Sequence, residues 1–256
     1  MDLGIKGRKA IVCASSRGLG KACAAALAAA GCAVTINGRD RGRLAETAAE
    51  IRAATGVEVH EVAGDLNDPQ ALEALFAACP EPDILVNNNG GPPPTAFADL
   101  TRDKILAALE ANMLTPIALI QRALPGMAAR RFGRIVNITS SSVRAPIPGL
   151  DASSGARAGL TAFVAAAARA CAGRNVTINA IQPGAFYTDR IRVALAAAAG
   201  EDAAAARARR EAAIPAGRFG RPEEFGALCA FLASASAGYI TGQNILIDGG
   251  AFPGAF

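Results

Sequence analysis

A short glycine-containing segment near the N-terminus has the composition of a phosphate-binding turn. An apolar run ends at Cys13, and Ala14-Ser15-Ser16-Arg17-Gly18-Leu19-Gly20 follows before an alanine-rich stretch that Gly31 closes. Glycines permit a tight turn and the close approach of a pyrophosphate, and the following helix N-terminus offers oriented N–H donors. The same residues also suit a plain strand-to-helix turn. Their place after the first strand of an α/β chain favours the nucleotide-binding interpretation.

The elements that must position this turn alternate along the chain. Short runs of residues that favour β-structure predict strands over 9–13, 33–37, 58–62, 83–87, 134–138, 175–181 and 243–247. Longer alanine- and leucine-rich runs predict helices near 18–30, 41–54, 69–78, 101–130, 153–172, 189–212 and 222–233. Strict alternation predicts one α/β domain over 1–256, a parallel sheet of about seven strands covered by helices on both faces. Segment 189–217 is interpreted as a helical substrate lid.

Several further segments share a family pattern with the glycine turn. The matching segments are 13–20, Asp65-Leu66, Asn87-Asn88-Asn89-Gly90, Asn112, 135–140, Asn179, Pro183-Gly184 with Thr188, 239–242 and 248–250. Together they resemble the short-chain dehydrogenase/reductase family, and most of all its β-ketoacyl carrier-protein reductase-like members. Cys13 and Ala14 replace the Thr and first Gly of the family loop, and Asn89 replaces an Ala. The resemblance covers nearly the whole chain and implies a Rossmann-type doubly wound fold.

The resemblance also implies a nicotinamide dinucleotide and the residues that would hold it. These cofactor-binding candidates are Ser15, Ser16, Arg17, Gly18, Leu19, Gly20, Arg39, Asp65, Leu66, Asn88, Gly90, Arg157, Pro183, Gly184 and Thr188. An acidic residue at the end of the second strand would bond the ribose hydroxyls of NAD, but Gly38 stands there. Arg17 and Arg39 can instead grip a ribose phosphate with charge-assisted hydrogen bonds. We therefore expect NADP(H), the alternative being that Arg39 is a solvated loop charge.

The catalytic positions of the family are altered in this chain. Family members use Asn, Ser and a Tyr-x-x-x-Lys pair, in which the Tyr exchanges the proton and the Lys lowers the Tyr pKa and holds the ribose. Asn112 and Ser140 match the first two, whereas Ser153 and Arg157 stand where Tyr and Lys are expected. Residues four apart share a helix face, so both can reach the site. A seryl hydroxyl is far less acidic than a phenol, and arginine does not exchange a proton.

Three explanations of this departure stay open. A water or another side chain, such as Tyr187, serves as the acid; or the substrate needs little acid assistance; or the protein binds a dinucleotide without turnover. The last would make it a sensor or assembly subunit. We favour an oxidoreductase that interconverts a carbonyl compound and its secondary alcohol. Epimerisation or dehydration on the same fold is a further alternative, since fold does not fix function.

Pro116 lies four residues after Asn112 in the predicted helix 101–130. Proline has no N–H to bond the carbonyl four residues earlier, so we expect a kink there and a free Asn112 carbonyl. That carbonyl would hold a water or accept a bond from Arg157. A bend that serves packing alone is the alternative.

Composition argues against several other classes of protein. The charge of +4 is modest, and the clusters at 130–131 and 207–210 suit solvated helix ends, so no nucleic-acid partner is expected. No run is long and apolar enough to span a membrane, and the polar start does not resemble a signal peptide, so a cytoplasmic protein is expected. Six cysteines without a Cys-x-x-Cys pair predict buried thiols. His60, the only histidine, falls in a strand, which argues against zinc or a Ser-His-Asp triad.

Apolar residues of the loops after the strands suggest where a small carbonyl or alcohol substrate would bind. They are Pro92, Pro93, Pro94, Phe97, Pro146, Ile147, Pro148, Phe186 and Tyr187. Open α/β sheets place ligands at this edge, although ordinary loop packing explains the same residues. Segment 222–250 resembles the family's subunit contact, so a homotetramer is expected.

Overall fold

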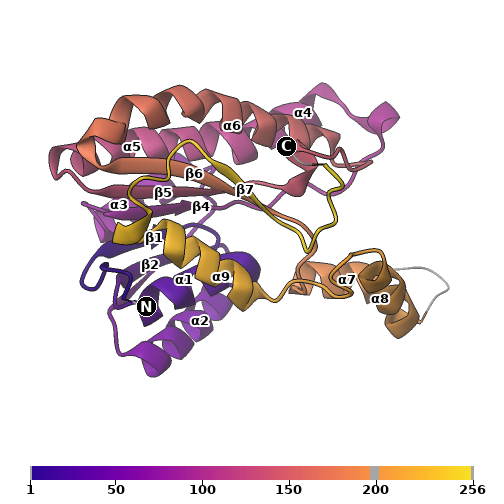
Figure 1. The fold of residues 1–256 in the computed structure, drawn as a ribbon, viewed down its shortest axis with the longest axis horizontal. Helices are drawn as coiled ribbons and strands as arrows, with labels where there is room; N and C mark the ends of the chain where they lie inside the picture. The colour runs from indigo at the N-terminus through magenta and orange to yellow at the C-terminus, as the bar shows by residue number, and fades with distance from the viewer. Residues whose placement is uncertain (1, 197–201, 255–256) are drawn as a thin grey trace.

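The computed structural model describes residues 2–196 and 202–254, which form an α/β fold around one parallel sheet (Figure 1). The seven strands follow the order β3-β2-β1-β4-β5-β6-β7. They are β1 (Lys9–Val12), β2 (Ala33–Gly38), β3 (Val59–Ala63), β4 (Ile84–Asn87), β5 (Gly133–Ile138), β6 (Val176–Pro183) and β7 (Asn244–Ile247). The predicted α/β fold with its seven-stranded parallel sheet is confirmed.

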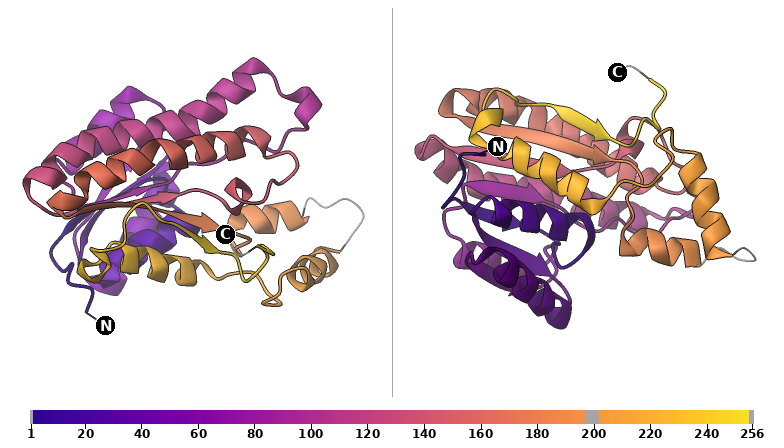
Figure 2. Two further views of the ribbon diagram at one scale, coloured as in Figure 1. Left: turned by 45° about the horizontal axis from the view of Figure 1, so that its top comes forward. Right: turned by 60° about the horizontal axis from the view of Figure 1, so that its bottom comes forward.

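Helices cover both faces of the sheet, as Figures 1 and 2 show. One layer holds α1 (Gly18–Ala29), α2 (Arg41–Thr55) and α9 (Pro222–Leu232); the other holds α3 (Pro69–Ala78), α5 (Thr115–Ala129) and α6 (Asp151–Cys171). Successive side chains of a strand point to opposite faces, so Ala10 and Val12 enter the first core while Ile11 and Cys13 enter the second. The central strands, such as β4 and β5, are therefore buried on both sides, whereas the edge strands β3 and β7 are partly exposed.

The chain reverses its direction of winding next to β1. Strand β1 pairs with β2 on one side and with β4 on the other. An open α/β sheet binds its ligand at such a switch point, beyond the carboxyl ends of the strands. The loops that follow β1, β2, β4, β5 and β6 all meet at this edge.

The predicted helix 101–130 is broken into three parts. It consists of α4 (Arg102–Leu109), a π-helical turn η2 (Glu110–Leu114) and α5, with Pro116 in the first turn of α5. The expected interruption is present, and it takes the form of a π-turn. Such turns occur frequently at functional sites.

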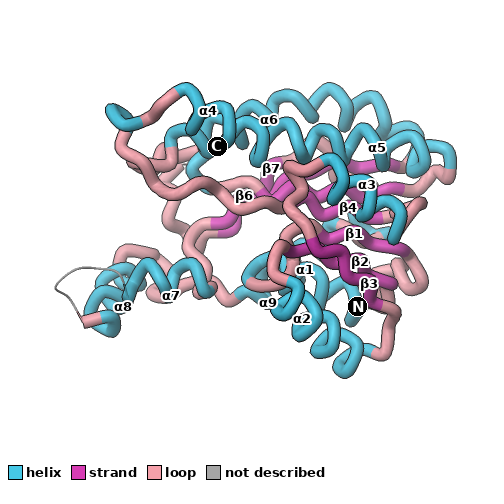
Figure 3. Tube along the Cα trace, turned by 180° about the vertical axis from the view of Figure 1, so that it is seen from behind, coloured by secondary structure: helices cyan, strands magenta, loops and turns pink. Residues whose placement is uncertain are grey.

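Two helices, α7 (Asp189–Ala196) and α8 (Ala203–Ala212), project beyond the open edge of the sheet (Figure 3). They cover the predicted helix 189–212 except for Asp202, which precedes α8, and 197–201, which lie outside the described residues. A small apolar cluster of their own joins them to the following segment, through Leu195, Ala206, Ile214 and Phe219. This pair of helices therefore packs separately from the two main cores.

The six cysteines are buried and unpaired, as the sequence predicts. His60 lies on β3 with its Nε2 3.1 Å from Glu58 Oε1, at the edge of the sheet away from the nucleotide loop. In the part of the chain that the structure describes, no helix is long and apolar enough to cross a bilayer. The described residues also contain no cluster of three His, Cys, Asp or Glu side chains suited to a metal.

Candidate functional site: a nucleotide loop beside a buried serine and arginine

The loop after β1 is tied to the end of β2. The buried Ser15 donates through Oγ to the Val12 carbonyl at 2.6 Å and through its backbone N to the Asn37 carbonyl at 2.7 Å. Asn37 in turn accepts a bond on Oδ1 from Ala14 N at 3.2 Å and donates through Nδ2 to the Val62 carbonyl at 3.0 Å. These bonds satisfy buried polar groups and hold the loop in one shape before any ligand binds.

Glycine is required at the start of α1. A Cβ added at Gly20 would lie 2.4 Å from the Ala14 carbonyl oxygen, which is backbone and unable to move aside. Ala14 itself has a φ of 44°, a left-handed conformation that costs a non-glycine residue energy. Asn88 Nδ2 donates to the Ala14 carbonyl at 3.1 Å. The alanine in place of the family's first Gly therefore keeps the backbone shape that a glycine would adopt.

Helix α1 presents its N-terminus to the open edge. Arg17 precedes the helix, and its exposed side chain does not cap it. Gly18 has a φ of 58°, and a Cβ added there would lie 3.7 Å from Thr188 Cγ2. The loop after β6 thus meets the loop after β1 at the point where uncapped N–H groups and the helix dipole favour an anion.

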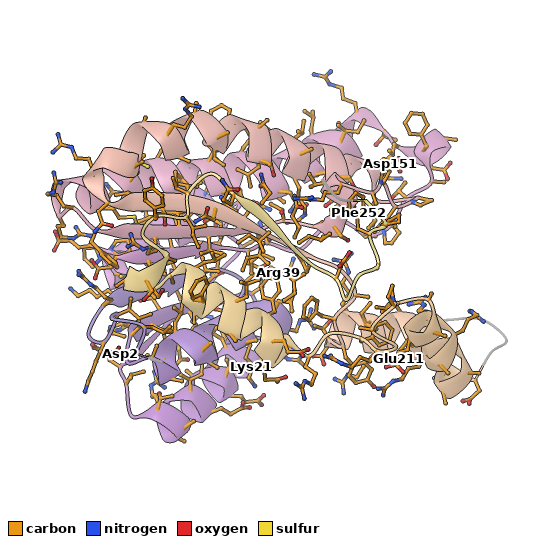
Figure 4. The ribbon with its side chains drawn as sticks, in the orientation of Figure 1. Asp2, Lys21, Arg39, Asp151, Glu211 and Phe252 are labelled. Carbon is orange, nitrogen blue, oxygen red and sulfur yellow. The ribbon has the colours of Figure 1, made fainter. Side chains whose placement is uncertain are left out.

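The end of β2 lacks an acidic side chain and is crowded by the loop. A Cβ added at Gly38 would lie 2.8 Å from Ser16 Oγ. Arg39 follows, with a side chain 76% exposed and Nη1 3.7 Å from Asp65 Oδ2; Figure 4 labels this arginine. The predicted residues Ser16, Arg39 and Asp65 therefore lie together. An ion pair this long and exposed binds Arg39 only weakly.

The remaining cofactor candidates lie around the same edge in different environments. Leu66 is buried in the core under α3, whereas the Gly90 carbonyl accepts a bond from Asn112 Nδ2 at 3.3 Å. Pro183 ends β6, and a Cβ added at Gly184 would lie 2.6 Å from Asp248 Cβ. Leu66 supports the edge by packing, and Gly184 allows β6 and the segment after β7 to approach closely.

Three of the four predicted catalytic residues form one hydrogen-bonded cluster. Ser153 Oγ donates to Asn112 Oδ1 at 2.9 Å and accepts from Arg157 Nε at 3.2 Å. Asn112 comes from the π-turn η2, and the other two lie one turn apart on α6. Exposed fractions of 1% for Asn112 and 8% for both Ser153 and Arg157 place the cluster below the surface. Ser153 and Arg157, four residues apart, thus lie on one face of the helix, as the sequence predicts.

The Arg157 guanidinium is buried among carbonyl oxygens. Nη1 donates to the Ile138 carbonyl at 2.7 Å and Nη2 to the Asn89 carbonyl at 3.1 Å. The suggested bond to the Asn112 carbonyl is wrong, because these contacts at the ends of β5 and β4 use the guanidinium instead. Burial, followed by the charge of Arg190, lowers the pKa of Arg157 to about 10. The group is therefore a cation at neutral pH, and no carboxylate among the described residues pairs with it.

Ser140 lies beyond the end of β5 and is not bonded to this cluster. Its Oγ accepts a bond from Ser142 N at 3.1 Å, and its own proton has no acceptor among the described residues. Ser154, next to Ser153, points away from this cluster, and its Oγ lies 2.8 Å from both Ser142 Oγ and the Leu150 carbonyl oxygen, so it donates to one of them at a time. The Ser140 hydroxyl therefore remains available to donate to a ligand.

Several residues proposed for the substrate pocket have other neighbours. Phe186 is buried edge-on against Phe225, with ring centroids 5.5 Å apart, so it is a core residue. Tyr187 stacks on Phe219 and lies under Arg207, and it lines a cavity of about 620 Å³ between α1, α7 and α9. Its contacts do not include the Ser153 cluster. An acid role for Tyr187 therefore receives no geometric support.

The proline loops meet at the other side of the site. Thr95 N donates to the Gly149 carbonyl at 3.0 Å, which joins the loop after β4 to the loop that leads into α6. Phe97 and Ile147 are exposed on these loops. They are thus free to contact a ligand, as the sequence suggests.

Two residues near the site were missed by sequence reasoning. Asn37 organises the nucleotide loop, and a buried asparagine at a strand end is a signal that would have found it. Arg190, on α7, points toward Gly91: a Cβ added at Gly91 would lie 3.5 Å from Arg190 Nη1 and 3.4 Å from Ser153 Oγ. No local pattern marks Arg190, because its position depends on the path of the chain after β6.

Comparison with known proteins finds similarity along nearly the whole chain. The family model described as enoyl-(acyl carrier protein) reductase matches residues 13–251. The 3-oxoacyl-[acyl-carrier-protein] reductase of Aquifex aeolicus is 34% identical over 265 residues, which cover 98% of this chain and 100% of that relative.

Solved structures show the same fold. L-sorbose reductase from Gluconobacter frateurii, in complex with NADPH and L-sorbose, has a TM-score of 0.92 and 28% identity, over 97% of this chain and 98% of that one. A 3-oxoacyl (acyl-carrier-protein) reductase from Agrobacterium tumefaciens C58 with NADP bound has a TM-score of 0.87 and 33% identity, over 97% and 95%. The chain belongs to the short-chain dehydrogenase/reductase family of oxidoreductases.

Proposed function

We propose that this protein is an NADP(H)-dependent oxidoreductase that interconverts a β-ketoacyl-like carbonyl compound and its secondary alcohol. The observation that carries the proposal is the buried cluster of Asn112, Ser153 and Arg157 at the edge of the sheet where the nucleotide loop opens. Ser153 and Arg157 take the places of the family's Tyr and Lys. Relatives that act on 3-oxoacyl compounds support the substrate class.

The residues present fit a dinucleotide. The Gly20 position leaves no room for a side chain, and the uncapped start of α1 offers N–H groups to a pyrophosphate. Solved relatives that hold NADPH or NADP support the same assignment. Ser15, Ser16, Gly18 and Leu19 would border the phosphates, with Asp65, Asn88, Gly90 and Thr188 along the rest of the edge.

The phosphate of NADP(H) fits the end of β2 better than the free ribose of NAD(H). An acidic side chain at Gly38 would collide with Ser16, and none is present to bond ribose hydroxyls. Arg17 and Arg39 are both exposed near this point, and Arg39 is held only by a long contact to Asp65. A guanidinium in that state can form charge-assisted bonds to a phosphate.

The chain's own residues stabilise negative charge on the substrate oxygen. When bound, the dinucleotide would supply a hydride, that is one hydrogen nucleus with two electrons, to the carbonyl carbon. The free hydroxyl of Ser140 donates to the carbonyl oxygen, and the Ser153 hydroxyl donates once it turns away from Asn112. Arg157 holds Ser153 from the opposite side and contributes its positive field, as in oxyanion stabilisation generally. The proton on the product oxygen then comes from water, since neither Ser153 nor Arg157 is a suitable acid at neutral pH.

Segment 189–217 is proposed as a lid over this edge. Helices α7 and α8 have their own small core and project from the body of the protein, which lets them move as a unit. Contacts of Arg43 with Asp189, at 3.2 Å, join α7 to α2. Closure would exclude water from the reacting carbonyl.

A homotetramer in the cytoplasm is proposed as the working form. The four residues of edge strand β7 are only half-buried, and Tyr239 just before it is fully exposed, which suits contact with another copy. Six unpaired thiols suit a reducing compartment. Light scattering that gives a monomer mass at all concentrations would contradict the tetramer.

The test of the proposed function is turnover with a carbonyl panel. The purified protein is mixed with NADPH and a panel of carbonyl compounds that contains both β-ketoesters and short oxo acids. The loss of the reduced nicotinamide absorbance is followed together with alcohol formation. We expect stoichiometric alcohol for each NADPH consumed. Binding of NADPH without turnover across the panel would contradict an oxidoreductase of carbonyls.

A further inference from the structure

We infer that the substrate carries a carboxylate close to its reacting carbonyl, and that Arg190 binds it. This inference rests on the proposed function and narrows its substrate to short oxo acids. It would make Arg190 the residue that determines specificity. The relevant juxtaposition is that of Arg190 with Ser153 over Gly91.

The Arg190 guanidinium lies close to the Ser153 hydroxyl. A single point, the place of a Cβ on Gly91, lies 3.5 Å from Arg190 Nη1, 3.8 Å from Arg190 Nη2 and 3.4 Å from Ser153 Oγ. Because Gly91 has no side chain, the hydroxyl and the guanidinium face one open space. A small molecule bonded to Ser153 therefore lies within reach of Arg190.

Arg190 has no carboxylate partner among the described residues. The neighbouring Asp189 is used by Arg43, at 3.2 Å, and by Arg192. Within the described chain, no carboxylate lies within 4 Å of Arg190 or Arg157, and the charge of Arg190 is one of the causes that lower the pKa of Arg157. The exposed Arg190 guanidinium, without a carboxylate partner, therefore favours an anion at the space over Gly91, and the buried charge of Arg157 behind Ser153 adds to this attraction.

The geometry of the Arg190 guanidinium suits a carboxylate. A guanidinium presents two parallel N–H donors that match a carboxylate. Since Arg190 and Ser153 flank the same point, the carboxylate and the carbonyl oxygen must be neighbouring groups on one molecule. A 2-oxo or 3-oxo acid meets this condition, whereas the ester or thioester of the same acid offers Arg190 no charge.

Arg190 lies at the start of α7, on the segment proposed as a lid. An acid bound to it would therefore join the lid to the Ser153 cluster on the body of the protein. A substrate without the carboxylate would leave α7 unattached at this point. The same contact thus serves recognition and closure.

The experiment measures binding, so that it does not depend on turnover. Melting temperatures are determined with saturating NADP⁺ and increasing pyruvate or acetoacetate, and with the methyl ester of each acid. We compare wild type with Arg190→Gln, and Arg192→Gln serves as the matched control two residues along the same helix. We expect at least one acid to bind wild type more tightly than its ester. Arg190→Gln should weaken the binding of that acid by about 10- to 100-fold, the range of a charge-assisted hydrogen bond, and should leave the binding of the ester and of NADP⁺ unchanged.

The other outcomes overturn the inference. Equal binding of acid and ester by wild type, or no binding of either, excludes a carboxylate site. If the preference for the acid over its ester survives Arg190→Gln, the carboxylate site lies elsewhere. If Arg192→Gln weakens binding of the acid as much as Arg190→Gln does, the preference arises from the overall positive charge of the helix and not from Arg190. Weaker NADP⁺ binding by Arg190→Gln with the acid preference intact assigns Arg190 to a cofactor phosphate. Failure of the proposed function shows separately, as absence of NADPH-dependent turnover.

Discussion

Ser153 Oγ is fixed from two sides, because it donates to Asn112 Oδ1 at 2.9 Å and accepts from Arg157 Nε at 3.2 Å. Both partners are themselves held by backbone carbonyls, Asn112 by Gly90 and Arg157 by Ile138 and Asn89. The hydroxyl is therefore positioned by the ends of β4 and β5 rather than by α6 alone. A buried cation stands directly behind it, where it can stabilise negative charge on a ligand.

The preference for NADP(H) should appear in ligand-dependent stability. A ligand that binds only the folded state stabilises it by about 2.7 kcal/mol at a hundredfold excess over Kd. NADPH should therefore raise the melting temperature more than equimolar NADH. Gly38→Asp should reverse this order, since it crowds Ser16 and adds negative charge near the phosphate; Gly42→Asp, on the exposed face of α2, is the control. Equal shifts by the two dinucleotides in wild type would refute the preference.

If Ser153 and Arg157 stand where the family has Tyr and Lys, as we propose, the pair should be convertible to the family's form. Ser153→Tyr with Arg157→Lys installs a phenol and its activator, and Gly91 leaves space beside residue 153. With NADPH and a β-ketoester, turnover should rise by ~10²-fold or more, within the range that positioned acids contribute. Neither single change should give this rise in turnover, because such pairs act as a unit.

NADPH binding by the double variant must be verified first, since tyrosine is much larger than serine. A double variant that binds NADPH but is no faster than wild type would show that the missing acid does not limit the native enzyme.

The charge of Arg157 should set the alkaline limit of activity. Its pKa is lowered to about 10 by burial and then by Arg190, so the cation persists at lower pH and is lost as pH rises through that value. kcat/KM should therefore fall above about pH 10, and the protein's folding must be monitored in parallel. Arg157→Lys should move the decline to lower pH, since lysine begins from about 10.4 and burial disfavours its cation as well. Profiles that coincide for the two proteins would mean that this charge has no role in catalysis.

The sequence predicted the elements well because local signals and tertiary structure agree. Strand and helix bounds match to within two residues for most elements, since glycines and aspartates such as Gly31 and Asp68 end and begin helices where the pattern requires. The pairing of Ser153 with Arg157 follows from helical periodicity. The π-turn does not, because the proline indicates an interruption without specifying its form.

What the sequence could not predict depends on contacts between distant segments. Arg157 bonds carbonyls at the ends of β4 and β5, and sequence reasoning wrongly directed it to Asn112. Arg190 reaches Gly91, about a hundred residues earlier in the chain, only because α7 follows β6 across the open edge. Phe186 resembled a pocket residue and proved to belong to the core.

The central claim is that Ser153 acts in the reaction, and one pair of variants tests it most directly. Ser153→Ala removes the hydroxyl between Asn112 and Arg157, and Ser154→Ala removes its neighbour, which bonds Ser142 and Leu150 instead. With NADPH and the best carbonyl of the panel, Ser153→Ala should lose ~10²-fold or more in kcat while its Kd for NADPH is unchanged, given the size of oxyanion-type contributions. Ser154→Ala should remain within a few-fold of wild type. Full activity of Ser153→Ala with intact NADPH binding would contradict the account.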